Sequence, residues 1–267
     1  MKKTLIAATL AAVATAGAAS AADLPRRAAP PMLPPAIPVF TWTGAYFGIN
    51  AGYISSDRNF VNTVAVAPVG AAAIALGQIP TSRNLNTDGF TGGGQVGYNY
   101  QIGNFVLGIE ADAAYTDMDR TVGFAGTGGF TTLHRQTLDY LGTVRGRVGL
   151  AFDRVLVYGT GGFAYGDVSY RTSTFAPGGA LVVGGSRSDF ETGWVAGGGI
   201  EYAMPTDSWL NFFRSSAVTV KAEGLYYDLG RRTIPVGSAA LGTVLASRYE
   251  TNGFIARVGL NYKFGTF

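Results

Sequence analysis

Charged residues recur at every second position in several segments of this chain, and their spacing is the first hint of its chemistry. Glu110 and Asp112 are two positions apart, as are Arg145 and Arg147. Side chains at positions i and i+2 lie on the same face of a β-strand. The residues between them are alanine and glycine, so the spacing predicts strands with one charged face and one face of small or apolar residues.

Catalysis is the first use to consider for such groups. The chain has no cysteine, no G-x-S-x-G motif and a single histidine, His134, which we expect in a long loop. Asp117 and Asp119 stand near a predicted strand end and could form a pair of catalytic carboxylates. Aspartates at such positions are more often solvated turn residues. We therefore predict a protein that is not an enzyme and needs no cofactor.

The pattern of a strand with one charged face is clearest in the last predicted strand, residues 254–264. Its alternate residues are apolar: Phe254, Ala256, Val258, Leu260, Tyr262 and Phe264. The other face carries Arg257, Gly259, Asn261 and Lys263, with Ile255 as its one large apolar residue. A half-buried strand of a soluble sandwich is the alternative. A cationic face opposite an aromatic one favours a transmembrane barrel strand, with lipid outside and a polar lumen inside.

Eight segments of this kind follow one another along the chain. They are residues 43–53, 90–101, 105–115, 138–151, 155–165, 190–203, 217–229 and 254–264. Short connections alternate with long ones of roughly 20 or 35 residues, which is typical of outer-membrane barrels. The sequence therefore predicts an all-β fold, an eight-stranded antiparallel transmembrane β-barrel with short periplasmic turns and long extracellular loops.

The N-terminal region predicts export. Residues 1–21 combine two lysines, an apolar run and an Ala-Ser-Ala site, which is the pattern of a signal peptide. Residues 22–40 are rich in proline and predict a periplasmic linker, and residues 41–267 the barrel. Without Lys2 and Lys3 the chain has 18 basic and 17 acidic residues, so no basic field for nucleic acid is expected.

Ten charged residues are expected to face the lumen. They are Glu110, Asp112, Asp139, Glu201 and Glu223 among the acids, and Arg145, Arg147, Lys221, Arg257 and Lys263 among the bases. An eight-stranded barrel has room inside only for side chains, and an unpaired charge in a confined site is costly. The equal numbers favour a salt-bridged plug, with an ion-selectivity filter as the alternative.

The first long loop contains an apolar segment, residues 64–77. It could form a contact surface for host molecules, haem or lipid, or fold back over the barrel mouth. A flexible loop rich in alanine and glycine is the plainer interpretation.

Four segments resemble, in order, the outer-membrane immunogenic-protein family of alphaproteobacteria, a group of small eight-stranded, porin-like barrels. They are residues 42–46 (WTGAY), 90–100 (FTGGGQVGYNY), 221–230 (KAEGLYYDLG) and 258–264 (VGLNYKF). The resemblance implies a location in the cell outer membrane, contact with its lipid and lipopolysaccharide, and recognition by the barrel assembly machinery. The implied assembly signal lies among Leu260, Tyr262, Phe264 and Phe267. Family members commonly end at the aromatic residue that matches Phe264, so the final Gly265-Thr266-Phe267 leaves the choice of phenylalanine open.

These observations predict a structural, surface-presenting barrel that contributes to envelope integrity and to contact with host or envelope components. A narrow passive pore for small solutes is the alternative. A binder of haem or of host ligands through the extracellular loops is a further one, although His134 offers it little ligand chemistry.

Overall fold

The computed structural model describes residues 40–57, 59–205 and 210–265. The predicted signal peptide, the predicted linker apart from Phe40, and Phe267 lie outside these residues. Within the described residues, no helix is both long enough and apolar enough to cross a membrane.

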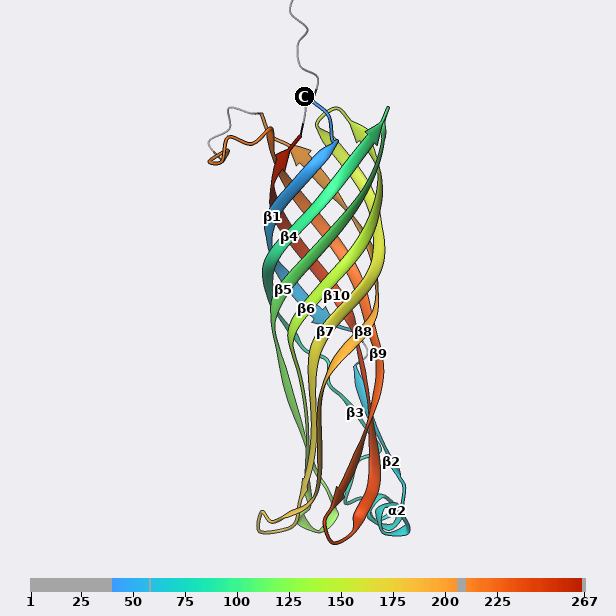
Figure 1. Cartoon of the computed structure of the whole chain (residues 1–267). Helices are drawn as coiled ribbons and strands as arrows, with labels where there is room; N and C mark the ends of the chain where they lie inside the picture. Colours follow the sequence, from blue (N-terminus) through green and yellow to red (C-terminus); the bar gives the residue numbers. More distant parts are fainter. Residues whose placement is uncertain (1–39, 58, 206–209, 266–267) are drawn as a thin grey trace, which may run out of the picture. The chain divides into compact units, whose positions relative to one another are not determined.

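Eight antiparallel strands form a closed ring (Figure 1). They are β1 (Gly44–Ser56), β4 (Asp88–Ile102), β5 (Phe105–Ala125), β6 (Thr131–Phe152), β7 (Val155–Phe175), β8 (Leu181–Ala203), β9 (Ala217–Ser238) and β10 (Gly242–Phe264). Each strand pairs with the next, and β1 pairs with β10 to close the ring. The predicted eight-stranded antiparallel barrel is confirmed.

The two ends of the barrel differ in their connections. At the turn end, the upper end in Figure 1, two-residue turns join β4 to β5 and β6 to β7. Gly103 and Asp153 begin these turns with φ values of 60° and 52°. Glycine adopts this left-handed conformation without steric cost, and aspartate tolerates it better than most residues. At the opposite loop end, the first connection contains β2 (Phe60–Ala65), the helix α2 (Pro68–Ala75) and β3 (Ser82–Asn84).

The strands are longer than predicted. Three connections expected to be long loops are instead continuations of the strands, with short tips that include the 3-10 turn η1 (Thr127–Gly129). Beyond the expected bilayer the alternation persists, but the outward residues there include charged ones instead of a continuous apolar row. On β6, for example, Thr132 and His134 are buried while Arg135 is exposed. The prediction was wrong because it looked for a lipid-facing apolar row, and this row ends where the strands leave the bilayer.

Two girdles of aromatic residues surround the barrel on its outer face. The girdle toward the loop end includes ring contacts between Tyr140 and Tyr165, Tyr165 and Phe190, and Trp194 and Tyr226, with centroids 5.4–6.0 Å apart. The girdle toward the turn end includes Phe47 stacked on Phe264 at 5.4 Å. Between the girdles the outward residues are apolar or small, as Ile49, Ile109 and Val258 are, with 60–67% of their surface exposed. This arrangement is that of a membrane-spanning band.

A bulge in β6 changes which residues face inward. Opposite β7, Leu138 and Tyr140 pair with the consecutive residues Val168 and Asp167, so Asp139 is an extra residue. An inserted residue reverses the inward and outward alternation on one side of the bulge. Toward the turn end the odd-numbered residues of β6 are buried, and toward the loop end the even-numbered ones are.

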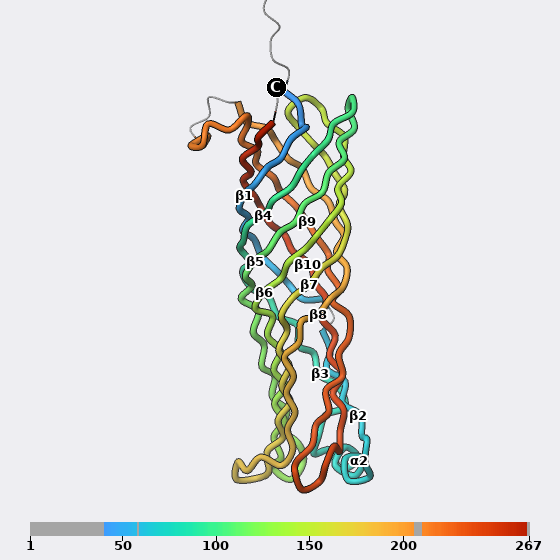
Figure 2. Tube along the Cα trace, viewed as in Figure 1, coloured from blue at the N-terminus to red at the C-terminus, as the bar shows by residue number. Residues whose placement is uncertain are grey.

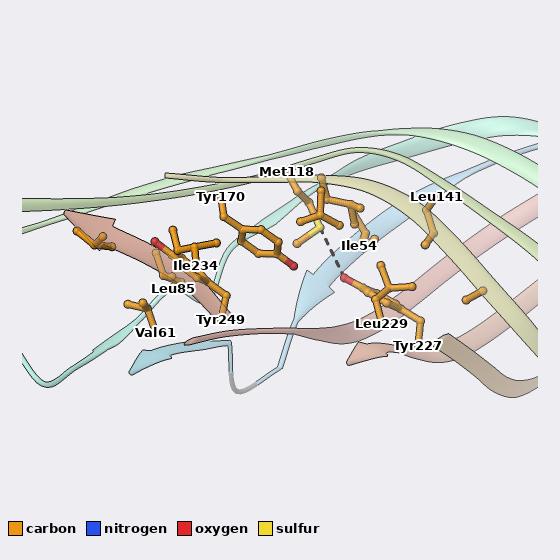
Figure 3. Close-up of a cluster of buried hydrophobic side chains, with 14 of the residues drawn as sticks. Ile54, Val61, Leu85, Met118, Leu141, Tyr170, Tyr227, Leu229, Ile234 and Tyr249 are labelled. Carbon is orange, nitrogen blue, oxygen red and sulfur yellow. Dashed lines mark hydrogen bonds between the residues drawn. The ribbon is translucent and has the colours of Figure 1, made fainter. Parts of the chain in front are cut away.

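Toward the loop end the barrel wall separates between two strands (Figure 2). β8 and β9 pair continuously from Trp194 to Ala203, and beyond this stretch only at Gly184 with Gly237. β10 stays paired with β9 along this stretch and pairs with β2 on its other side, and β2 pairs with β3. The strands enclose an apolar cluster here (Figure 3), whose members include Ile54, Met118, Leu138, Tyr170, Tyr227, Leu229, Ile234 and Tyr249. The loop end therefore has a hydrophobic core of its own.

Candidate functional site in the barrel lumen

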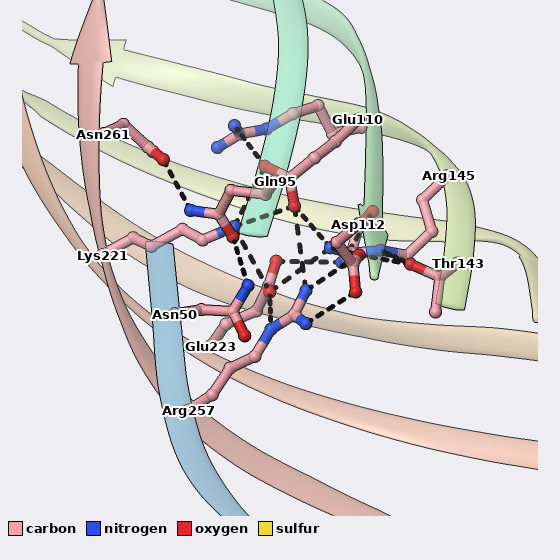
Figure 4. A network of polar contacts seen from close by, with 12 residues as sticks. Asn50, Gln95, Glu110, Asp112, Thr143, Arg145, Lys221, Glu223, Arg257 and Asn261 are labelled. Carbon is pink, nitrogen blue, oxygen red and sulfur yellow. Dashed lines mark hydrogen bonds and ion pairs between the residues drawn. The ribbon is translucent and has the colours of Figure 1, made fainter. Parts of the chain in front are cut away.

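Eight of the ten charged residues predicted for the lumen form one network of ion pairs inside the barrel, and six of them are labelled in Figure 4. The eight are Glu110, Asp112, Glu201 and Glu223 with Arg145, Arg147, Lys221 and Arg257. The side chains of all eight are at most 2% exposed. Four acids therefore face four bases in a closed space.

Arg145 lies at the centre of this charge network. Its guanidinium contacts three carboxylates: Glu223 at 2.9 Å, Asp112 at 3.1 Å, and Glu110. Glu110 is its direct cross-strand partner on β5. The side chain of Thr143 accepts a further hydrogen bond from Nε of Arg145 at 2.9 Å. Arginine suits this position because its planar fork can donate to several carboxylates at once.

Arg257 completes the inner part of the charge network from the opposite wall. Its Nη1 lies 2.9 Å from Asp112 Oδ1, and its Nε donates to Glu223 Oε2 at 2.8 Å. Glu223 is its register partner on β9, whereas Asp112 is reached across the lumen. Asp112 and Glu223 thus each bridge Arg145 and Arg257, which ties β5 and β6 to β9 and β10.

The remaining pairs lie nearer the turn end. Arg147 Nη2 donates to Glu201 Oε2 at 2.7 Å, and Lys221 Nζ donates to Glu110 Oε1 at 2.8 Å. Lys221 stands directly opposite Glu201 in the sheet. Its ammonium nevertheless reaches Glu110 on the far wall, so register alone does not give the partner.

Neutral polar side chains donate further hydrogen bonds to the oxygens of these carboxylates. Tyr46 donates its hydroxyl to Glu110 at 2.8 Å, and Tyr158 donates to Glu223 at 3.0 Å. Asn261 Nδ2 donates to Glu201 at 3.0 Å. Buried charges are tolerated when they are paired and hydrogen-bonded in this way.

Apolar side chains close the lumen on both sides of the charge network. Toward the turn end, Trp42 is 1% exposed and packs with Leu156 and Phe40. Toward the loop end, Leu141 and Leu225 begin the core of Figure 3. Among the described residues, no group of three or more His, Cys, Asp or Glu side chains could hold a metal ion. With every carboxylate engaged by cations or hydroxyls, the arrangement suits a structural plug better than acid–base chemistry.

Two of the residues predicted for the lumen are not part of the charge network. Asp139 is exposed on the outer surface because the β6 bulge turns it outward, so its assignment to the lumen was wrong. Lys263 faces inward but lies apart from the network, with its ammonium 5.6 Å from the ring centroid of Phe40.

The candidate catalytic aspartates and His134 lie on opposite faces of the barrel wall. Asp117 and Asp119 lie on the outer surface, and Asp119 forms an ion pair with Arg135. His134 is not in a loop, as predicted, but inside β6 and only 1% exposed. Its Nδ1 contacts the hydroxyl of Thr172 at 3.0 Å.

The predicted assembly signal is partly covered. Tyr262 is 8% exposed because Phe213, from the connection between β8 and β9, packs on its ring with centroids 4.8 Å apart. Its hydroxyl donates to the backbone carbonyl of Leu210 at 2.9 Å. Leu260 and Phe264 lie on the same outward face, and Phe267 is outside the described residues. Recognition of these residues by the assembly machinery stays a prediction.

Tyr46 and Tyr158 were missed by sequence reasoning. Their inward position could have been predicted, because each stands directly opposite a glycine on the neighbouring strand: Gly97 for Tyr46 and Gly199 for Tyr158. A Cβ atom on Gly97 would lie 2.4 Å from the Tyr46 ring. An inward tyrosine lying over a cross-strand glycine is a pattern that register could have revealed.

Sequence comparisons match this chain to outer-membrane barrel proteins. The family described as "Outer membrane protein beta-barrel domain" matches residues 7–264. The 31 kDa outer-membrane immunogenic protein of Brucella melitensis biotype 1 is 35% identical over 99% of this chain and 100% of its own length. The 22 kDa outer membrane protein of Rhizobium leguminosarum bv. viciae is 28% identical over 86% of this chain and 82% of its own. Among solved structures, OprG from Pseudomonas aeruginosa covers 83% of this chain and 97% of its own, with 12% identity and a TM-score of 0.48.

Proposed function

The chain belongs to the outer membrane β-barrel family, among the outer-membrane immunogenic proteins of alphaproteobacteria, and from this premise we propose that it is a closed structural barrel. The protein resides in the outer membrane as a surface protein. Its proposed role is to stabilise the envelope and to hold a folded platform outside it for contact with host or envelope components.

The charge network carries the proposal that the barrel is closed. A selectivity filter needs charged groups that face a path of water. Here the guanidinium of Arg145 is fully buried and three carboxylates surround it. Apolar clusters lie on both sides of the network, and its eight charged side chains are at most 2% exposed. This supports the plug over the passive pore.

The loop end supports the role as a platform. Its strands pack around their own apolar core, and residues 64–77, which include α2, fold back against β10. Of the alternatives left open for this segment, this packing supports folding back onto the loop end of the barrel over a flexible loop. The alternative of a haem binder is not supported, because its one candidate ligand, His134, lies inside the core and not on the surface.

Contact with lipopolysaccharide is supported by two arginines on the outer face. Arg135 on β6 and Arg171 on β7 are direct cross-strand partners, beyond the aromatic girdle at Tyr140 and Tyr165. Like charges directly opposite each other destabilise a sheet. Asp119 compensates one of them, and a phosphate group of the outer leaflet would compensate the other.

A deletion strain tests the envelope role. Loss of the protein should raise the uptake of a bulky apolar dye and the sensitivity to detergent, and expression of the wild-type chain should restore both. Arg171→Ala should restore the barrier less well than Thr233→Ala, which also removes an exposed side chain beyond the bilayer. A deletion strain whose dye uptake and detergent sensitivity equal those of its parent would contradict the envelope role.

A further inference from the structure

Helix α2 lies at the loop end of the barrel, beside the tips of the strands (Figures 1 and 2). The backbone amides of Val66 and Ala67 donate to the carbonyl of Val244 at 3.0 and 3.2 Å, which fixes the start of the helix on β10. A Cβ atom on Gly70 would lie 2.3 Å from the same carbonyl. Glycine is therefore required for this close approach.

The helix does not fill the space beneath it. A cavity of about 290 Å³ remains between α2, the tip of the β5–β6 hairpin, and strands β7, β8 and β10. Its floor is the buried part of the loop-end core, with Val183, Val244 and Leu245 at most 4% exposed. Apart from Val69 at the rim, the helix lines it with glycine and alanine, including Ala73, where larger side chains would have filled the cavity. The described residues that line it carry no charge.

We infer that this cavity binds an uncharged, apolar molecule of one or two aromatic rings. An apolar cavity of roughly 150 Å³ is enough to hold benzene, and this one is larger. At its rim Val69, Leu76 and Leu241 expose about half of their surface or more to water. A ligand would cover them. The side chains of Gln78 and Thr174 are the polar groups among the lining residues, so one hydrogen-bonding group on the ligand can be matched.

The ligand must come from the outer medium and not from the bilayer. The girdle residue on β5 is Tyr115, and the strand continues to Ala125. Ten residues at about 3.3 Å each place its tip roughly 30 Å further along the strand. The acyl chains of the outer leaflet therefore cannot reach the cavity, and no charged residue lines it to bind their headgroups.

The neutral dye N-phenyl-1-naphthylamine can test the inference on the full chain in phospholipid nanodiscs. Two variants should block the cavity: Ala73→Phe on the helix and Val182→Phe on β8, both of which line it. Ala71→Phe is the matched control, because Ala71 is exposed on the same helix and does not line the cavity. Heat-modifiable migration in gels establishes that each variant has folded.

The wild-type protein and the control should give saturable fluorescence above that of empty nanodiscs, with one dye per chain. Either blocking variant should lose about tenfold in affinity or more, because the filled space no longer buries a ring. Signals equal to those of empty nanodiscs, or equal in all variants, would overturn the inference. If the wild-type protein proved to be a dimer and a blocking variant a monomer, the cavity would belong to a contact between copies, and the inference would be overturned as well.

Discussion

Removal of the Arg145 guanidinium is the most informative perturbation of the charge network. Its side chain is fully buried and contacts Glu110, Asp112 and Glu223. Arg145→Met retains much of the apolar stem but leaves four buried acids facing three bases. Breaking a buried ion pair costs about 3–5 kcal/mol, and water admitted to the vacated space would lower this figure. We expect a loss of about 2–4 kcal/mol in the free energy of unfolding.

Arg135→Met is the matched control on the same strand. Arg135 also pairs with an aspartate, Asp119, but the two side chains are 53% and 44% exposed. Exposed pairs contribute about 0–1 kcal/mol. Urea titration of the barrel in lipid vesicles, followed by heat-modifiable migration, measures both losses. Equal losses would refute the claim that burial makes the charge network costly to break.

A second substitution separates charge balance from packing. Glu110→Gln combined with Arg145→Met leaves three acids and three bases in the charge network. The double variant should be more stable than the sum of the single losses predicts, with a coupling of about 0.5–3 kcal/mol. Strict additivity would mean that the two residues do not act through their charges.

Three further predictions concern the lipid face, the loop-end core and the packing of the tyrosines. Val258→Arg, between the girdles, should lower the free energy of unfolding by about 2–4 kcal/mol, whereas Thr233→Arg, exposed beyond the bilayer, should lower it little; equal effects would contradict the assigned membrane band. Burial lowers the pKa of His134 to about 4 from 6.5, so the unfolded chain binds more protons between these values. Stability should fall by about 3 kcal/mol as the pH falls from 6.5 to 4, and His134→Asn should flatten this part of a pH series of urea midpoints. Gly97→Val should cost about 1–3 kcal/mol by displacing Tyr46, whereas Gly224→Ala, whose Cβ would meet open space, should be neutral in the same titration.

The membrane-spanning part of the fold was predictable because lipid imposes one simple rule on outward residues. Phe254, Val258 and Phe264 are exposed on one face of β10, and Arg257 and Asn261 are buried on the other, as their alternation indicated. Between the girdles this period of two is unbroken, so it identified both the strands and their inward faces.

Prediction failed where the alternation was interrupted or where another solvent replaced lipid. The bulge at Asp139 reverses the faces of β6, and no feature of the local sequence marked it. Beyond the girdle, water lies outside and a mixed polar and apolar core inside, so His134 lies in a strand that looked like a loop. Lys221 pairs with Glu110 because its side chain extends across the lumen. The alternation pattern of single strands does not predict such a contact.

Ion conductance in a planar bilayer tests the central claim, that a charge network closes the lumen, most directly. The wild-type barrel should give no current steps above the baseline of the lipid alone. Removing two of the three arginines of the network, as Arg145→Ala with Arg147→Ala, should create space lined by unpaired carboxylates and so produce small, cation-preferring currents. Large and stable channels from the wild-type barrel would contradict the account and identify the protein as a pore.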